Sequence, residues 1–157
     1  MIIKNHPVLL LSFLILLPTT AWSNHQAVIS DAWIADAPPV SKIRAAYLRL
    51  ENTGDHPISI KSFTSQDFDR IELHKTIVAD GIVKMEKINK LVIEKGQHIM
   101  FKPGGYHLML FNPKRKLKKG DKVKLQITLR DNNTTEFVAT VLKRGEHKQM
   151  DHEHHHH

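Results

Sequence analysis

The chain has 157 residues, of which 41% are hydrophobic and 25% are charged, a composition typical of a single folded domain. It has a formal net charge of +7 and no cysteine. The lack of cysteine excludes disulfides, iron–sulfur clusters, thiolate zinc sites and blue-copper sites, because each of these needs a Cys sulfur. The chain nevertheless contains 12 histidines, an unusually high number for its length.

The first 23 residues have the pattern of a secretory signal peptide. Lys4 supplies the positive charge, residues 8–17 are an apolar run, and Ala21 and Ser23 are the small residues of a cleavage site. A membrane-spanning helix needs about 20 apolar residues, and this run is too short for that. We therefore expect residues 1–23 to be removed and the mature protein to be periplasmic.

After this segment, polar and apolar residues alternate with a period of two, as in half-buried β-strands. Turn residues such as Asp80-Gly81 separate the runs, and no stretch of the mature chain has helical periodicity. The pattern predicts an all-β domain over residues 24–142, an antiparallel sandwich or barrel with Greek-key links. The expected strands are Val28–Ile34, Arg44–Glu51, Ile58–Phe63, Phe68–Lys75, Ile82–Ile88, His98–Phe101, His107–Phe111, Lys122–Arg130 and Thr134–Leu142.

One predicted hairpin carries two candidate metal ligands, His74 and Met85, on the strands that flank Asp80-Gly81. A four-residue loop would set these two residues directly opposite each other, and a two-residue loop would make them diagonal neighbours. In both cases their side chains share a face, with about 5–8 Å between the Cβ atoms. A three-residue loop would place them on opposite faces.

A second pair of candidate ligands, His107 and Met109, has the i, i+2 spacing that points two side chains to one face of a strand. The turn at residues 102–106 could bring this strand beside the hairpin, so that two imidazoles and two thioethers converge. Thioethers are soft ligands that favour Cu(I), whereas zinc prefers thiolate, imidazole and carboxylate. His98 and Met100 have the same spacing, and methionines in strands usually fill the core. Local spacing therefore does not decide between the two pairs.

The four residues of the first set, with their surroundings, resemble the PCuAC family of periplasmic copper chaperones. The spacing His74-x10-Met85-x21-His107-x-Met109 looks like the signature of that family, and the resemblance covers residues 27–142. The matching blocks are Glu72-Leu73-His74, Asp80-Gly81, and Lys102-Pro103-Gly104-Gly105-Tyr106-His107-Leu108-Met109-Leu110. The resemblance implies a cupredoxin-like Greek-key β-sandwich with an exposed Cu(I) site made of His74, Met85, His107 and Met109.

The resemblance also implies a function, the delivery of copper to respiratory oxidase assembly. The implied recipients are the copper centre of cytochrome c oxidase subunit II and Sco-type thiol copper proteins. We expect a monomeric carrier, not an enzyme, that meets the membrane only through its partner. With 6% aromatic residues and no nucleic-acid-binding module, we expect no nucleic-acid partner. Two alternatives are copper storage or scavenging, and a structural β-sandwich that binds metal only through its tail.

The tail, residues 143–157, has no apolar periodicity and is predicted to be disordered. Flexible, imidazole-rich segments suit Cu(II), so we expect the tail to capture Cu(II) as a secondary site. The alternative is an expression tag. The candidate tail ligands are His147, Met150, His152, His154, His155, His156 and His157.

Overall fold

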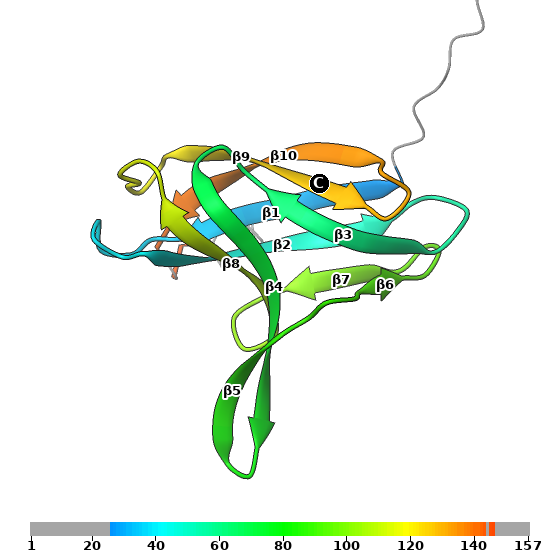
Figure 1. Cartoon of the computed structure of the whole chain (residues 1–157), viewed down its shortest axis with the longest axis horizontal. Coiled ribbons are helices and arrows are strands. Elements are labelled where there is room, and N and C mark those ends of the chain that lie inside the picture. The colour runs from blue at the N-terminus through cyan, green and yellow to red at the C-terminus, as the bar shows by residue number, and fades with distance from the viewer. Residues whose placement is uncertain (1–25, 144, 147–157) are drawn as a thin grey trace, which may run out of the picture.

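Ten β-strands make up the regular structure of residues 26–143 and 145–146, which are the residues described by the computed structural model (Figure 1). The predicted signal peptide and most of the predicted tail lie outside these residues, and the division into three segments stays a prediction. The strands are β1 (Ala27–Ala35), β2 (Ile43–Asn52), β3 (Ile58–Thr64), β4 (Phe68–Ala79), β5 (Ile82–Lys87), β6 (Val92–Ile93), β7 (His98–Phe101), β8 (Tyr106–Pro113), β9 (Lys122–Leu129) and β10 (Thr134–Leu142).

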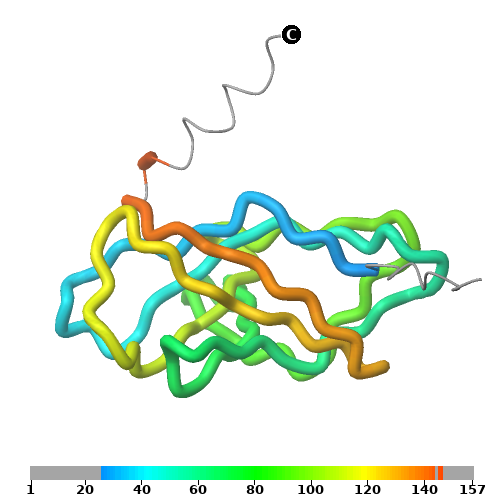
Figure 2. The backbone as a smooth tube through the Cα atoms, turned by 90° about the horizontal axis from the view of Figure 1, so that it is seen from above, coloured from blue at the N-terminus to red at the C-terminus, as the bar shows by residue number. Residues whose placement is uncertain are grey.

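The strands follow one another in the order β5-β4-β8-β7-β2-β1-β10-β9-β3-β6, and β8 also pairs with β2. This sheet curls around its main apolar core, so that the tube in Figure 2 outlines a flattened sandwich. A second, smaller buried cluster contains Trp33 and Tyr47. Most neighbours are antiparallel, but β1 runs parallel to β10. Non-sequential neighbours such as β4 and β8 place distant segments side by side, which is what a Greek-key connection does.

The core consists of every second residue along the strands, the residues that face inward, as the period-two pattern predicts. Leu73 of β4 and Leu108 and Leu110 of β8 are buried in it, beside Leu125 and Ile127 of β9. Their neighbours in sequence point to the opposite face of the sheet. The residues of the candidate metal site lie on that outer face.

The predicted all-β class is confirmed, and each of the nine expected strands is present within a few residues of its predicted ends. The tenth strand, β6, was not predicted, because two residues are too few to show an alternating pattern. Among the described residues, none forms a helix long and apolar enough to cross a membrane.

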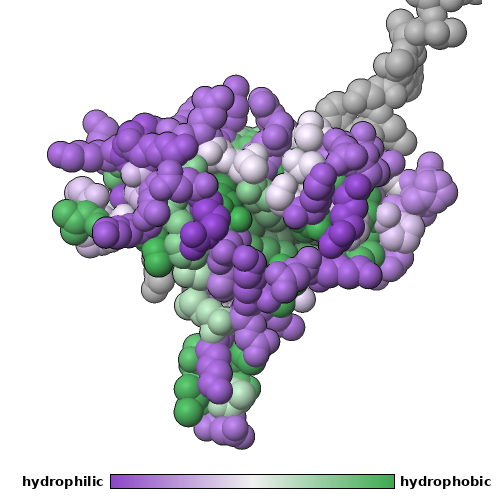
Figure 3. Space-filling view, viewed as in Figure 1, coloured by the Kyte–Doolittle hydropathy of each residue, from purple (hydrophilic) through white to green (hydrophobic). Residues whose placement is uncertain are grey.

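The β4–β5 hairpin projects from the body as a two-stranded arm (Figure 1). Every residue of β5 is exposed, and Val78, Ile82 and Val83 near the tip are more than half exposed. Figure 3 shows hydrophobic residues on this arm, outside the core. Met85 lies on the same strand, so one candidate ligand belongs to the arm and not to the body.

Candidate metal centre

Two histidines face each other across the central strand pair of the site. His74 of β4 is directly opposite His107 of β8, and their ring centroids are 6.0 Å apart. In the same register Glu72 lies opposite Met109. Since cross-strand partners share a face, these four side chains lie together on the outer face, while Leu73 between them points into the core.

The turn before β8 fixes the orientation of His107. The carbonyl of Gly105 accepts a hydrogen bond from the backbone N–H of Thr76 at 3.1 Å, which joins the turn to β4. The same carbonyl lies 3.1 Å from Nδ1 of His107. A carbonyl can only accept, so Nδ1 carries the proton of a neutral imidazole and Nε2 has the free lone pair.

Glu72, two residues earlier on β4, fixes the orientation of His74, but it bonds the other ring nitrogen, Nε2 instead of Nδ1. Nε2 of His74 lies 3.0 Å from Oε2 of the Glu72 carboxylate. An ionised carboxylate only accepts hydrogen bonds, so Nε2 donates and Nδ1 has the free lone pair.

The two lone pairs have no partner in the described part of the chain. Nδ1 of His74 and Nε2 of His107 are both buried and make no hydrogen bond there. A buried polar atom without a partner is costly, and such atoms are rare in native proteins. Histidines that bind metals commonly donate their second ring N–H to a carboxylate or a backbone carbonyl, as these two do. Both histidines therefore have the arrangement typical of metal ligands, with one ring N–H donated to an acceptor and the other nitrogen unpartnered among the described residues.

The hairpin turn places Met85 on the same outer face. Asp80 and Gly81 both have positive φ, 53° and 75°, which identifies a two-residue type I′ loop. Thr76 is directly opposite Met85, and His74 is therefore its diagonal neighbour. Of the three loop lengths that the sequence analysis considers, the structure has the two-residue one, which keeps the two side chains on one face.

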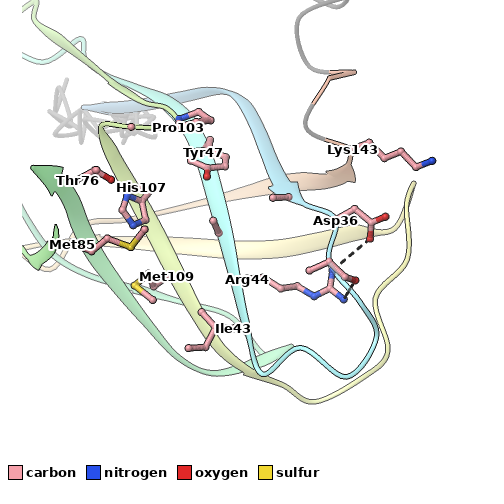
Figure 4. Close-up of a pocket in the computed structure, with 14 residues that line it drawn as sticks. Asp36, Ile43, Arg44, Tyr47, Thr76, Met85, Pro103, His107, Met109 and Lys143 are labelled. Atoms are coloured by element: carbon pink, nitrogen blue, oxygen red, sulfur yellow. Dashed lines mark hydrogen bonds and ion pairs between the residues drawn. The ribbon is translucent and has the colours of Figure 1, made fainter. Parts of the chain in front are cut away.

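Met85, His107 and Met109 line a surface pocket of about 570 Å³ (Figure 4). In Figure 4 the side chains of Met85, Met109 and His107 lie close together beside Thr76. His74 is not part of the pocket lining and approaches His107 from β4. Met85 is 61% exposed and His107 only 4%, so the site has one buried and one open side.

The second His-x-Met pair lies elsewhere. His98 and Met100 are on β7, opposite Glu51 and Arg49 of β2, and both are exposed. Neither residue lines the pocket. The structure therefore brings together the set that the family resemblance favours. Within residues 26–143 and 145–146, no three His, Cys, Asp or Glu side chains cluster as a metal site.

Positive charges surround the Glu72 carboxylate. Oε1 lies 2.8 Å from Nζ of Lys87 and 3.1 Å from Nε of Arg70. The hydrogen bond from Lys87, followed by that from His74, lowers the pKa of Glu72 to about 2. The carboxylate is therefore ionised at neutral pH and keeps its role as an acceptor.

An ion pair between the buried Arg44 and the exposed Asp36 forms the opposite wall of the pocket (Figure 4). The Arg44 side chain is 1% exposed and lies 3.7 Å from the Asp36 carboxylate. Its Nη2 donates to the carbonyl oxygens of Ala37 and Leu117. Arg44 thus links the loop after β1 to the loop before β9 at the edge of the site.

Sequence reasoning quoted Glu72 and Gly105 as parts of matching blocks but gave them no role. For Glu72 a local signal exists, because residues 72 and 74 share one face of a strand. For Gly105 no such signal exists, because its carbonyl acts through the three-dimensional shape of the turn. Arg44 was also missed, since an alternating strand pattern does not predict a buried arginine.

Known protein families and sequences include several that are similar to this chain. The family model described as "Putative lipoprotein LpqE-like" matches residues 27–141. An uncharacterised protein of Rickettsia prowazekii is 34% identical over 98 residues, which cover 62% of this chain and 53% of that protein. A putative lipoprotein of Leifsonia xyli is 28% identical over 114 residues, covering 72% of this chain and 68% of that protein. The chain thus spans about half the length of the Rickettsia protein.

Solved structures show the same fold. The copper-bound PCuAC domain from PmoF2 superposes with a TM-score of 0.63 at 15% identity, covering 75% of this chain and 93% of that domain. The Cu(I) form of DR1885 from Deinococcus radiodurans has a TM-score of 0.60 at 29% identity, covering 78% of this chain and 84% of that one. The predicted resemblance to PCuAC domains and the cupredoxin-like fold are confirmed.

Proposed function

Because this chain belongs to the LpqE-like family, the PCuAC-type family of putative lipoproteins, we propose that it is a copper chaperone that works outside the cytoplasm. It binds Cu(I) through Nδ1 of His74, Nε2 of His107 and the sulfur atoms of Met85 and Met109. The observation that carries the proposal is the pair of buried, unpartnered imidazole nitrogens on the face that also bears both methionines.

The ligand types favour Cu(I) over other metals. Two thioethers and two neutral imidazoles are soft to intermediate ligands, which suit Cu(I) better than zinc or magnesium. All four are neutral, so the loaded site keeps the single positive charge of the ion. The Cu(I) form of the Deinococcus protein, at 29% identity, supports this choice.

The open side of the site suits transfer by ligand exchange. Met85 lies on the exposed β5 strand, so an incoming thiolate of a partner can replace its thioether while the two imidazoles still hold the ion. No electron moves in this exchange, since copper stays Cu(I) throughout. The proposed recipients are the copper centre of cytochrome c oxidase subunit II and Sco-type thiol proteins, and the proposed chaperone is a monomeric carrier without enzymatic activity.

The proposed compartment is the periplasm, reached through cleavage of residues 1–23. The putative lipoprotein of Leifsonia xyli, at 28% identity, supports a location outside the cytoplasm. Copper storage is the alternative that shares the same site. A storage protein would bind Cu(I) equally well but would not pass it to a recipient, so a transfer assay separates the two functions.

An anaerobic Cu(I) competition titration tests the body site. The mature chain should bind one tight Cu(I), and the variants Met85→Ala and Met109→Ala should bind it more weakly. Met100→Ala is the matched control. Like Met109, Met100 lies on a strand two residues after a histidine, but it is exposed and lies outside the proposed site. Equal weakening in all three variants, or no stoichiometric Cu(I) in the parent chain, would refute the proposed site.

The proposed tail site needs a separate experiment. A chain that ends at Glu146 lacks His147 to His157 and should lose Cu(II) binding while its Cu(I) affinity stays unchanged. If the shortened chain still takes up Cu(II) like the full one, the tail is not the Cu(II) site. If it loses Cu(I), the tail contributes to the body site.

A further inference from the structure

Glu72 shares the outer face of β4 with His74 but has no place among the four proposed ligands. Its carboxylate contacts His74 on one oxygen and two cations on the other. With a side chain only 16% exposed, Glu72 is the most enclosed carboxylate in contact with the site. A largely enclosed carboxylate costs desolvation free energy, so its presence here indicates a specific role.

We propose that Glu72 is a positioning residue that selects the tautomer of His74 and thereby makes Nδ1 the atom that binds Cu(I). This inference rests on the proposed function for the identity of the ion. It also makes a prediction for the metal-free protein, because the hydrogen bond to Glu72 sets the tautomer of His74 before a metal binds.

The two oxygens of Glu72 have different partners, and this difference fixes the carboxylate. Oε1 accepts a hydrogen bond from Lys87 at 2.8 Å and forms an ion pair with Nε of Arg70 at 3.1 Å, and Oε2 accepts from His74 at 3.0 Å. Lys87 lies directly opposite His74 across the β4–β5 pair. The guanidinium of Arg70 also stacks on Phe111, 4.0 Å from the ring centroid, so it is held from two sides.

A neutral imidazole has one proton and two nitrogens, so fixing the proton on Nε2 leaves the lone pair on Nδ1. That lone pair is buried and unpartnered beside His107. With the proton on Nδ1 instead, His74 would present an N–H to the ion and could not bind it without a rearrangement. Groups that orient metal-binding histidines in this way typically change metal affinity 10–100-fold when they are mutated.

The arrangement makes a specific prediction for Glu72→Gln. Lys87 donates a hydrogen bond to Oε1 and the cationic Arg70 lies beside the same atom, so both favour the amide oxygen of the glutamine at that position. The amide nitrogen then faces Nε2 of His74 and donates to it, which moves the imidazole proton to Nδ1. Glu72→Gln therefore places a proton on Nδ1 of His74, the atom that would bind Cu(I). Glu72→Ala only removes the hydrogen bond that holds the proton on Nε2. We expect Glu72→Gln to weaken Cu(I) binding about 10–100-fold and Glu72→Ala to weaken it less.

The decisive measurement is the tautomer of His74 in the metal-free mature chain. Long-range 1H–15N correlation spectra at pH 8, where an ordinary imidazole is neutral, distinguish the two nitrogens, and His74→Gln assigns the signal. We expect a proton on Nε2 in the parent chain and on Nδ1 in Glu72→Gln. The matched control is Glu51→Gln, because Glu51 also pairs with an arginine and lies opposite His98. This control should leave both His74 and Cu(I) binding unchanged.

A proton on Nδ1 in the parent chain would overturn the inference without any variant. An unchanged tautomer in Glu72→Gln, or Cu(I) affinity that is equal in Glu72→Gln and the parent chain, would also overturn it. Failure of the parent chain to bind Cu(I) would refute the proposed function instead, and the tautomer spectra would still decide the role of Glu72.

Discussion

His74 and His107 face each other across β4 and β8, and each has one ring nitrogen bonded to an acceptor and the other without a partner in the part of the chain that the structure describes. The acceptors are of different kinds, a carboxylate for His74 and a backbone carbonyl for His107. As a result the two rings keep different nitrogens, Nδ1 of His74 and Nε2 of His107, without a hydrogen-bond partner among the described residues. The pair is asymmetric although both residues are histidines in matched register.

The two methionines should affect stability differently. Met85 is 61% exposed on an edge strand, so Met85→Ala should change the free energy of unfolding of the apo protein by no more than about 0.5 kcal/mol. Met109 is half-buried on β8, and Met109→Ala should cost about 1–2 kcal/mol, less than for a fully buried methionine. Urea denaturation of both apo variants measures this. Equal losses would show that the arm packs more tightly than its exposure indicates.

Arg44 should be a major determinant of stability at the edge of the pocket. Arg44→Ala removes a buried side chain and leaves the carbonyl oxygens of Ala37 and Leu117 without their donor, which should cost about 2–4 kcal/mol. Arg49→Ala is the control, because the Arg49–Glu51 pair is exposed and should contribute at most about 1 kcal/mol. Thermal denaturation at neutral pH compares the two, and a similar loss in both variants would contradict the role of burial.

Glu72 should titrate far below an ordinary glutamate. The hydrogen bonds from Lys87 and His74 lower its pKa from 4.5 to about 2 in the folded protein. Because the folded pKa is depressed, Glu72 contributes stability that is fully present above pH 4.5 and is lost as the pH falls toward 2. Carboxyl 13C shifts followed through an acid titration should show the low midpoint. Lys87→Met should raise that midpoint, and an unchanged midpoint in this variant would argue against Lys87 as the main cause.

The tip of the arm depends on the backbone conformation of Gly81. Its φ is 75° and no atom lies within 4 Å of an added Cβ, so Gly81→Ala introduces conformational strain alone, about 1–2 kcal/mol. The strain should appear as faster amide hydrogen exchange in β5, with β2 unchanged. Gly145→Ala is the control. Like Gly81, Gly145 has open space around an added Cβ, but unlike Gly81 it does not have a positive φ. Unaltered exchange in β5 would mean that the turn tolerates a side chain.

Local patterns predicted the elements of the fold well, because each long strand buries one face and so alternates in sequence. The same patterns predicted that His74 and Met85 share a face, since both even loop lengths give that result. The facing pair of His74 and His107 could not be derived locally. It depends on the register between β4 and β8, two strands that are far apart in the chain and not joined by a hairpin.

The finer chemistry of the site was also beyond a sequence pattern. The alternation shows that Glu72 and His74 point the same way, but not that Lys87 and Arg70 occupy the other oxygen of Glu72. Arg44 follows Ile43 in a strand and looks like a solvent-facing residue. It is buried because two loops close over it, and loop positions are set by the whole fold.

The long-range pairing of β4 with β8 also couples the proposed Cu(I) binding to the folding of the chain. A chain that has formed only its first five strands holds His74 and Met85 but not His107 and Met109. Such a half-set lacks the facing ring, so Cu(I) should bind strongly only after the distant strand has docked. Binding to the folded state alone stabilises it, by about 2.7 kcal/mol when free Cu(I) is 100 times the Kd. In the proposed function, unfolding of the protein therefore releases the ion, and the Cu(I)-bound form resists both unfolding and the proteases that attack unfolded chains.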